Sequence, residues 1–322
     1  MDDTILYLSE ADVAALGMDL DALRDAVAAA FASKARGRAD ASSKSVVNVA
    51  PGHIFQAKPG ILREAGLAGM KWFGLLPPGS TGGPSIISTI LISDIASGRP
   101  LGILGGDWIT AKRTAAMSAI AAQKLARPAS ASIGFVGAGV QGASHLEALP
   151  RVLPRLRRAV ICSRSEASAR RLGDAARKMG LDVEVTKDPR RAVEGLDVVV
   201  TTVPEGATTL EFLDPGWVAP GAFVAAVDLA RSWDRNKLRQ LELLATDDHE
   251  QTRTLTAAGR MTWAGPYEAD LADLCSGKAA GRTSDTQRAL FNFSGHALAD
   301  LAAAQIAIAT ARAKGLGMRL PR

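Results

Sequence analysis

Cysteine is scarce in this sequence, which has only Cys162 and Cys275 among its 322 residues. Two cysteines cannot build a disulfide framework, and Cys162 lies in an apolar segment typical of a strand, so we expect a reduced, structural thiol. Histidine is also rare, with four residues, and the histidines, cysteines and aspartates lack the paired spacing of metal ligands. The sequence therefore predicts no metal site.

Aromatic residues make up only 5% of the chain, and the net charge is a modest +5, from 38 basic and 33 acidic residues. A nucleic-acid-binding surface usually has a denser basic stripe with aromatic side chains between the charges. No stretch reaches the roughly 18 uninterrupted apolar residues of a membrane span, and the opening MDDTILYLSE lacks the basic and apolar regions of a signal peptide. We therefore expect a cytoplasmic protein that binds neither nucleic acid nor membrane.

The length and the hydrophobic content of 47% indicate a globular protein with two domains. Residues 45–106 contain apolar segments separated by glycine and proline, which is typical of strands, and a helical pattern follows over 108–125. From residue 129 onward, short apolar strands alternate with helices, which predicts a parallel sheet with helices on both faces. The last helix, 296–314, follows the end of this alternation and is expected to pack on the N-terminal domain.

The predicted fold class is therefore α/β. Residues 127–295 are expected to form a doubly wound parallel sheet of the Rossmann type, which binds a dinucleotide. Residues 1–126 and 296–322 are expected to form a second, α+β domain.

The segment GAGVQG follows the apolar strand IGFV and begins a predicted helix. Gly137 permits a tight turn, Gly139 lets the backbone approach a diphosphate, and Gly142 allows close packing of helix on strand. The helix N-terminus supplies backbone donors and partial positive charge. This context predicts a phosphate loop, and the alternative interpretation is a glycine turn without a ligand. The cofactor-binding candidates of this region are Gly137, Gly139, Val140, Gln141, Gly142 and, at the end of the segment LDVVVTTV, Thr202.

The end of the second strand distinguishes the two nicotinamide dinucleotides. An acidic residue there binds the ribose 2′-hydroxyl of NAD, but this chain has Ser163, Arg164 and Ser165. A guanidinium between two hydroxyls suits a 2′-phosphate better, so NADP(H) is favoured. The alternative is that Arg164 stacks on the adenine, which would leave NAD(H) usable.

Three charged residues stand in apolar surroundings: Lys71 in LAGMKWFG, Arg113 in an alanine-rich helix, and Asp228 at the end of FVAAVDLA. Burial would lower the pKa of Lys71 and make it an acid–base group, unless the side chain extends to solvent. Arg113 needs an anionic partner, either a ligand or an acidic side chain of the protein. Asp228 lies where parallel sheets bind ligands, or it caps a following helix.

The chain resembles the ornithine cyclodeaminase/mu-crystallin family in four segments: GMKWFG (69–74), ITAKRTAAMSAIAAQKLA (109–126), GAGVQGASHLEAL (137–149) and AAVDLA (225–230). Weaker similarity at 92–104 and 291–317 extends the resemblance over nearly the whole chain. The resemblance implies hydride transfer at an amino-acid C–N bond. It also implies a homodimer that is joined through the α+β domain, which would bind the small imino- or amino-acid substrate.

The resemblance assigns roles to individual residues. Lys71 matches an active-site lysine, Arg113 an arginine that binds the substrate carboxylate, and Asp228 a catalytic aspartate. Thr114 matches a residue near the cofactor phosphates, and Thr89 a residue near the nicotinamide.

The sequence departs from the family in the segment that precedes the predicted strand with Lys71. Many members have a second carboxylate-binding arginine there, where this chain reads ASSKSVVNVA (41–50). Lys44 is the nearest substitute and would hold a carboxylate as a point charge. The departure argues against ornithine as the substrate. The segment LLPPGSTGGPS (75–85) is expected to form a mobile loop that sets substrate size.

Together these residues predict an NAD(P)H-dependent oxidoreductase that transfers hydride to or from the α-carbon of an imino or amino acid, as an imine or ketimine reductase does. Arg113, with Lys44, would hold the carboxylate, Lys71 would protonate or polarise the reacting group, and Asp228 would stabilise positive charge. Two alternatives stay open. One is an ornithine cyclodeaminase, which makes proline and ammonia with catalytic NAD; the other is a non-catalytic NADP(H)-dependent protein that binds a small ligand, like mu-crystallin.

Overall fold

The computed structural model describes the chain except residues 1–3, 43, 78–84, 205–209, 262 and 264. The chain forms two compact units: unit 1 comprises Met1–Ala116 and Gly295–Arg322, and unit 2 comprises Met117–Ser294. The sequence placed the first boundary ten residues later, at residue 126, and the second boundary one residue later, at residue 296. Most of the expected loop 75–85 lies outside the described residues.

Unit 1 is built on one eight-stranded sheet. Its strands are β1 (Thr4–Leu8), β2 (Ala39–Ala41), β3 (Ser45–Ala50), β4 (His53–Leu62), β5 (Leu67–Leu75), β6 (Ile86–Asp94), β7 (Pro100–Gly105) and β16 (Met318–Pro321). Their order is β16-β1-β7-β6-β5-β4-β2, and β3 pairs with β4. The pairing of β1 with β7 is parallel and the other pairings are antiparallel.

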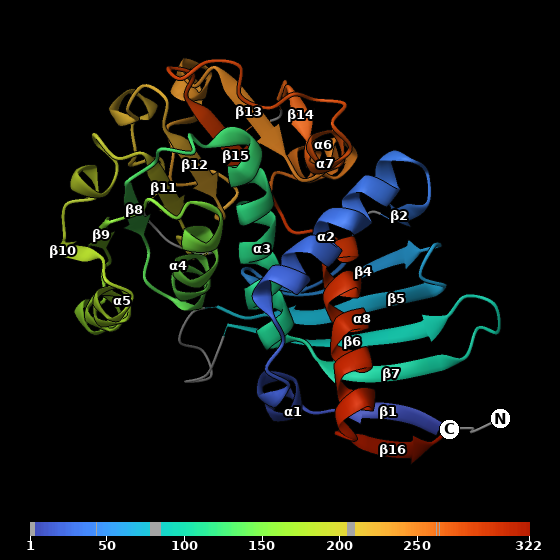
Figure 1. Ribbon diagram of the computed structural model, residues 1–322. Coiled ribbons are helices and arrows are strands. Elements are labelled where there is room, and N and C mark those ends of the chain that lie inside the picture. Colours follow the sequence, from blue (N-terminus) through green and yellow to red (C-terminus); the bar gives the residue numbers. More distant parts are fainter. Residues whose placement is uncertain (1–3, 43, 78–84, 205–209, 262, 264) are drawn as a thin grey trace. The chain divides into compact units, whose positions relative to one another are not determined.

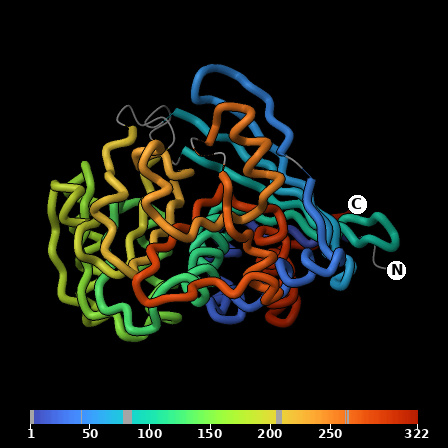
Figure 2. The backbone as a smooth tube through the Cα atoms, turned by 90° about the horizontal axis from the view of Figure 1, so that it is seen from above, coloured from blue at the N-terminus to red at the C-terminus, as the bar shows by residue number. Residues whose placement is uncertain are grey.

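The helices of unit 1 are α1 (Glu10–Ala15), α2 (Leu20–Ala35), the first half of α3 (Asp107–Leu125) and α8 (Ala297–Lys314). Figures 1 and 2 show α8, in red, beside α2, in blue, as expected for a last helix that returns to the N-terminal domain. Residues 297–304 of α8 are all buried. The helix can approach the sheet closely because a Cβ at Gly69 in β5 would lie only 2.8 Å from Leu301 Cδ2.

The central strand β5 presents different residues to the two faces of the sheet. Lys71 and Phe73 are buried, whereas Trp72 between them is 41% exposed. Successive side chains of a strand point to opposite faces, so Lys71 points to the face that α8 covers. A lysine at a core position of a central strand needs a partner, and this requirement leads to the candidate site.

Unit 2 contains one parallel sheet. Its strands are β8 (Ser132–Val136), β9 (Arg158–Cys162), β10 (Asp182–Thr186), β11 (Val198–Thr201), β12 (Phe223–Ala226), β13 (Leu243–Thr246), β14 (Ala269–Asp270) and β15 (Ala289–Asn292). The order is β10-β9-β8-β11-β12-β15-β13-β14, and every pairing is parallel. The order reverses between β8 and β11, as in a doubly wound Rossmann sheet. The predicted fold class is confirmed.

The connections of unit 2 place two helices next to the first strands of the sheet. They are α4 (Val140–Val152), after β8, and α5 (Glu166–Lys178), after β9. Further along the chain come α6 (His249–Ala257), α7 (Leu271–Ser276) and the short 3-10 turns η1 (Arg190–Ala192), η2 (Pro215–Trp217) and η3 (Arg235–Gln240). Cys162, at the end of β9, is buried and not in a disulfide, as expected for a structural thiol.

Candidate active site

In unit 1, two cations share one buried carboxylate. Lys71 Nζ, on β5, donates a hydrogen bond to Asp300 Oδ1 at 2.9 Å, and Arg113 Nε, on α3, donates to the same oxygen at 2.8 Å. Lys71 also donates to Thr110 Oγ1 at 3.2 Å. The side chains of Lys71 and Arg113 are 2% and 4% exposed, and that of Asp300 is fully buried. Lys71 therefore does not extend to solvent, and Arg113 has the protein's own acidic partner.

Asp300 was not predicted from the sequence. It lies in the first turn of α8, where the helix dipole favours a negative charge. The sequence feature that could have identified Asp300 is its position as the one acidic residue of ALADLAAA, a segment with no other polar side chain. Its second oxygen, Oδ2, is buried and makes no hydrogen bond within the described part of the chain.

The two partners of Asp300 differ in how readily they lose a proton. Burial, and then the nearby charge of Arg113, lowers the pKa of Lys71 well below its usual value, and Asp300 opposes this shift. Burial alone would raise the pKa of Asp300, but Arg113 and Lys71 outweigh burial and hold that pKa at about 2. Since arginine stays protonated in proteins, Lys71 is the cation of this group that more readily gives up its proton.

A second buried lysine, Lys58 on β4, was also not predicted from the sequence. It is the direct cross-strand partner of Lys71, and its Nζ donates to the carbonyl of Gly295 at 3.2 Å. The Nζ atoms of Lys58 and Lys71 lie 5.2 and 5.3 Å from the centre of the Phe73 ring. The sequence feature that could have revealed Lys58 is the alternation of buried and less buried residues along β4. The buried positions of this strand are Ile54, Gln56, Lys58 and Leu62.

Gly295 shapes the space around Arg113. Its φ of +79° is in the left-handed region, and a Cβ at this position would lie 2.6 Å from Arg113 Nη1. Another residue here would therefore displace the guanidinium. Gly295 is followed by His296, whose Nδ1 accepts a hydrogen bond from the backbone of Leu298 and caps α8.

The other three candidates of unit 1 are Thr89, Thr114 and Lys44. Thr89 is the cross-strand partner of Trp72 and is exposed, so it faces the opposite side of the sheet from Lys71. The Thr114 hydroxyl donates to the carbonyl of Thr110 within α3. Lys44 is half-buried just before β3. Of these three residues, Thr89 faces away from Lys71, and the predicted roles of all three stay predictions.

In unit 2, the predicted phosphate loop connects β8 to α4. Gly137 has a φ of +111°, and a Cβ there would collide with Thr202 Oγ1. A Cβ at Gly142 would lie 2.8 Å from the carbonyl oxygen of Gly137. These two glycines are required by the fold. Gly139 is different, because a Cβ there would meet no protein atom within 4 Å.

The start of α4 suits a diphosphate. Gly139 is its N-cap without a side-chain hydrogen bond, and the first turn contains no acidic residue. Val140 is 69% exposed. Backbone donors at a helix N-terminus with open space before them favour an anion. Thr202 Oγ1 and Gln141 Oε1 are buried without a hydrogen-bond partner in the described chain, so polar atoms are available beside the loop. The arrangement fits a dinucleotide.

His145, on α4, supports the loop from behind. Its Nδ1 lies 2.7 Å from the carbonyl oxygen of Gln141, and its Nε2 lies 2.8 Å from Ser118 Oγ. Burial lowers the pKa of His145 to about 4, so the ring is neutral. It then donates to the carbonyl and accepts from the serine. This is a structural role.

The segment after β9 keeps Arg164 accessible. Ser165 caps α5 by accepting from the backbone of Ser168 at 3.3 Å, and Ser163 Oγ accepts from the backbone of Ser165 at 3.3 Å. Arg164 is exposed, and within the described residues it makes no hydrogen bond or ion pair. The guanidinium is therefore available for a ligand at the end of the second strand.

Asp228 lies just beyond β12 and is 4% exposed. Its Oδ1 accepts from Thr201 Oγ1 at 2.8 Å and its Oδ2 from Ser232 Oγ at 2.6 Å. Burial raises the pKa of Asp228, while the hydrogen bonds from Ser232 and Thr201 act in the opposite direction. The next helix, η3, is capped by Asp234, so Asp228 is not a helix cap.

The backbone immediately after Asp228 is strained. Leu229 and Ala230 have φ values of 61° and 55°, a region that residues other than glycine rarely adopt. Such conformations cost about 1–3 kcal/mol each and cluster at functional sites. These two residues lie between Asp228 and Ser232, whose hydroxyl donates to the Asp228 carboxylate.

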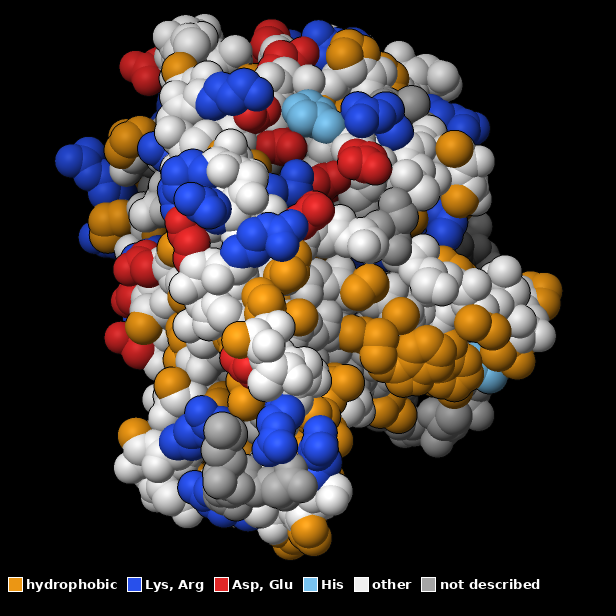
Figure 3. All heavy atoms as spheres, turned by 90° about the vertical axis from the view of Figure 1, so that its right-hand side faces the viewer, with side chains coloured by type: hydrophobic (Ala, Val, Ile, Leu, Met, Phe, Trp, Pro, Cys, Tyr) orange, Lys and Arg blue, Asp and Glu red, His pale blue; other side chains and the backbone are white. Residues whose placement is uncertain are grey.

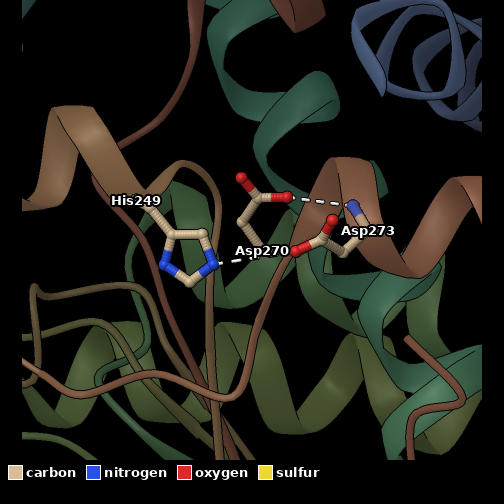
Figure 4. Close-up of side chains that lie close together, drawn as sticks. All are labelled: His249, Asp270 and Asp273. Carbon is tan, nitrogen blue, oxygen red and sulfur yellow. Dashed lines mark hydrogen bonds and ion pairs between the residues drawn. The ribbon is translucent and has the colours of Figure 1, made fainter. Parts of the chain in front are cut away.

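A group of possible metal ligands also lies in unit 2, at His249, Asp270 and Asp273 (Figure 4). His249 Nε2 lies 3.7 Å from Asp273 Oδ2, and Asp270 Oδ1 accepts from the backbone of Asp273 at 2.9 Å. Lys278 Nζ lies 3.1 Å from Asp273 Oδ1. A helix cap, the Lys278–Asp273 ion pair and the His249–Asp273 contact explain this group, and we assign no metal to it.

Comparison with known proteins places these features in context. The model of the ornithine cyclodeaminase/mu-crystallin family matches residues 5–315. Among solved structures, an archaeal alanine dehydrogenase dimer with bound NAD has a TM-score of 0.87 and 25% identity, covering 98% of this chain and 99% of that one. The Δ1-pyrroline-2-carboxylate reductase of Thermococcus litoralis, in complex with NADH and L-proline, has a TM-score of 0.88 and 25% identity, covering 98% and 100%.

A third structure is the iminosuccinate reductase of Paracoccus denitrificans in complex with NAD+, with a TM-score of 0.84 and 26% identity, covering 98% and 99%. The three proteins are named for different substrates, and each of the three structures contains a bound nicotinamide cofactor. A search for membrane-spanning helices among the described residues finds none with the necessary length and apolar character.

Proposed function

Because the chain belongs to the ornithine cyclodeaminase/mu-crystallin family, we propose that it is an NAD(P)H-dependent oxidoreductase that reduces the C=N bond of an imino acid to an amino acid. The observation that carries the proposal is the buried group of Lys71, Arg113 and Asp300. With all three ionised it has a net charge of +1, which a substrate carboxylate neutralises. The names of NAD-bound structural neighbours support the same reaction class.

A nicotinamide cofactor, held by the loop that starts at Gly137, would supply the hydride. Arg113 binds the substrate carboxylate, and the shared oxygen of Asp300 fixes the direction of its guanidinium. Lys71 protonates the imine nitrogen, since its lowered pKa makes it a stronger acid than an exposed lysine. Asp228 stabilises positive charge on the nitrogen. The net change adds one hydride to carbon and one proton to nitrogen.

The experiment that tests the proposal follows NADPH and NADH oxidation at 340 nm with cyclic imines and with 2-oxo acids plus ammonia or methylamine. Turnover of an imine supports the proposal. Conversion of ornithine to proline and ammonia without net cofactor oxidation would instead identify a cyclodeaminase. Tight NADPH binding with no turnover of any substrate would identify a binding protein.

We propose that the cofactor is NADP(H), because Arg164 is exposed and positively charged at the end of the second strand. Arg164→Asp is expected to raise the Kd for NADPH by about 10–100-fold, the value of a charge-assisted contact. The Kd for NADH should not rise. Fluorescence titration measures both constants.

The matched control is Arg177→Asp, which changes the same charge near the other end of α5 and should leave both constants unchanged. If Arg164→Asp also leaves the NADPH constant unchanged, Arg164 does not contact the 2′-phosphate.

We further propose that two copies associate through the face of the unit 1 sheet opposite α8. Val47, Phe55, Gly74 and Ile87 are paired in one row across β3, β4, β5 and β6. Val47 and Ile87 are 53% and 54% exposed, and Trp72 stacks on Phe55 at 5.6 Å between ring centres. Figure 3 shows a broad patch of hydrophobic side chains, in orange. Monomers rarely expose large apolar patches, and the alanine dehydrogenase structure is described as a dimer.

Ile87→Glu is expected to convert the dimer to a monomer, because it places two charges in an apolar interface. Size-exclusion chromatography with light scattering measures the change in mass. Val185→Glu, at a 40% exposed valine of unit 2, is the control and should remain dimeric. A wild-type monomer at micromolar concentration would contradict the proposal.

A further inference from the structure

Lys71 is buried, yet the proposed reaction requires it to gain a new proton in every turnover. Its side chain is 2% exposed, and within the described residues it donates hydrogen bonds to two side chains, Asp300 and Thr110. Asp300 cannot return a proton, because it is fully buried and its pKa is held at about 2. The new proton therefore has two routes, one through Thr110 and one from solvent that enters when the product leaves.

A line of hydrogen-bonding groups leads from Thr110 toward the surface. Thr110 Oγ1 lies 3.4 Å from Ser88 Oγ, and Ser88 Oγ donates to Asp107 Oδ1 at 2.9 Å. Because Lys71 uses the Thr110 oxygen as its acceptor, the proton of the Thr110 hydroxyl can point at Ser88. Ser88 is 5% exposed, whereas Asp107 is half-buried. The line thus joins the buried ammonium group to a carboxylate on a residue that solvent reaches.

The fold holds Ser88 between Lys71 and the start of α3. Ser88 lies on β6 two residues from Ile90, the cross-strand partner of Lys71, so its side chain points to the same face of the sheet. Its backbone N–H also donates to Asp107 Oδ1, at 2.7 Å. A Cβ at Gly106 would lie only 2.7 Å from Ser88 Oγ. A side chain at position 106 would therefore displace the serine, and glycine lets the helix start come this close.

We propose that Thr110, Ser88 and Asp107 form a proton relay that returns a proton to Lys71 after each turnover. The inference rests on the proposed function, in which Lys71 gives its proton to the imine nitrogen.

The relay moves one proton in three transfers between neighbouring groups. Solvent protonates the Asp107 carboxylate, which passes a proton to Ser88 Oγ. Ser88 passes its own proton to Thr110 Oγ1, and Thr110 passes its own to Lys71 Nζ. Each hydroxyl gains one proton and loses one, so the net change is one proton moved from solvent to Lys71. The 3.4 Å between the two hydroxyls exceeds the usual length of an O–H···O hydrogen bond, so they must approach each other for the proton to pass.

Asp107→Asn tests the relay with little change in shape, because the amide oxygen still accepts from Ser88 but does not take up a proton. Stopped-flow absorbance at 340 nm follows NADPH oxidation with the imine that the wild type reduces fastest. The first turnover, which uses the proton already on Lys71, is expected at the wild-type rate. Later turnovers should be about 10–100-fold slower, which is part of the usual effect of an acid–base group. Ser88→Ala should give the same burst, and Thr110→Ser, which keeps the hydroxyl, should retain steady turnover.

Asp94→Asn is the matched control. Asp94 Oδ2 also accepts from the backbone N–H and the hydroxyl of one serine, Ser97. Within the described chain, neither residue is hydrogen-bonded to Lys71 or Thr110, so this variant should turn over steadily at the wild-type rate. Steady wild-type turnover in Asp107→Asn as well would overturn the proposal, because solvent would then reach Lys71 by the other route. A first turnover as slow as the later ones would also overturn it, because Asp107 would then only hold Ser88 in place.

A measurement without substrate separates the relay from the proposed function. NMR of protein with ¹⁵N-labelled lysine gives the rate at which Lys71 Nζ exchanges protons with water. Asp107→Asn is expected to slow this exchange by a factor similar to that for steady turnover. Slowed exchange in a protein that reduces no imine would support the relay and contradict the proposed function. Reduction of an imine together with unchanged exchange in Asp107→Asn would support the function and overturn the relay.

Discussion

Replacing Lys71 with methionine is expected to lower kcat by about 10²–10⁴-fold, the usual contribution of a general acid or base. Methionine has nearly the length of lysine but cannot carry a proton, so the imine nitrogen loses its proton donor. Dinucleotide binding should be unchanged, because the predicted phosphate loop belongs to unit 2. Steady-state kinetics with the best imine and fluorescence titration with NADPH measure the two effects.

Lys178→Met is the control for this experiment, because Lys178 is exposed at the end of α5. It should retain wild-type kcat and wild-type NADPH binding. A Lys71→Met variant with unchanged kcat would remove Lys71 from the reaction, and with it the main support for the proposed site.

Asp300→Asn is expected to lower the free energy of unfolding by about 3–5 kcal/mol, the cost of removing one partner from a buried ion pair. The amide leaves the Arg113 guanidinium buried without a compensating charge, and arginine cannot become neutral. Urea denaturation measures the change. Because the pKa of Asp300 is held at about 2, its stabilising effect is present above about pH 4 and is lost as the pH falls toward 2. The variant should therefore lose less stability than the wild type over this range.

Asp174→Asn is the matched control, since Asp174 forms an exposed ion pair with Arg177 on α5. Surface pairs of this kind contribute at most about 1 kcal/mol. If Asp300→Asn were no more destabilising than Asp174→Asn, the buried group would not hold unit 1 together as described.

The Rossmann unit was predictable because its signals are local. The glycine spacing of 137–142, the strand before it and the helix after it all lie within about twenty residues, and each has a direct physical reason. The order of the strands in each sheet was harder to predict from the sequence. The edge pair β1 and β16 joins residues 4–7 to 318–321, and such long-range pairing leaves little trace in local periodicity.

The candidate site of unit 1 was predictable only in part, for the same reason. Lys71 and Arg113 stood out as charges in apolar segments, but their shared partner Asp300 is 229 residues away from Lys71. Lys58 and Thr89 show that alternation has to be followed strand by strand. Lys58 shares the buried face with Lys71, whereas Thr89 lies on the opposite face.

The central claim is that the protein transfers a hydride from the nicotinamide to the α-carbon of an imino acid. NADPH that carries deuterium at the transferred position of nicotinamide C4 tests it most directly, with oxaloacetate or pyruvate plus ammonia as the imine source and mass spectrometry of the product. The expected result is an amino acid with one deuterium at its α-carbon and an equal amount of NADP+. An amino acid formed without deuterium, or no amino acid from any imine, would contradict the claim.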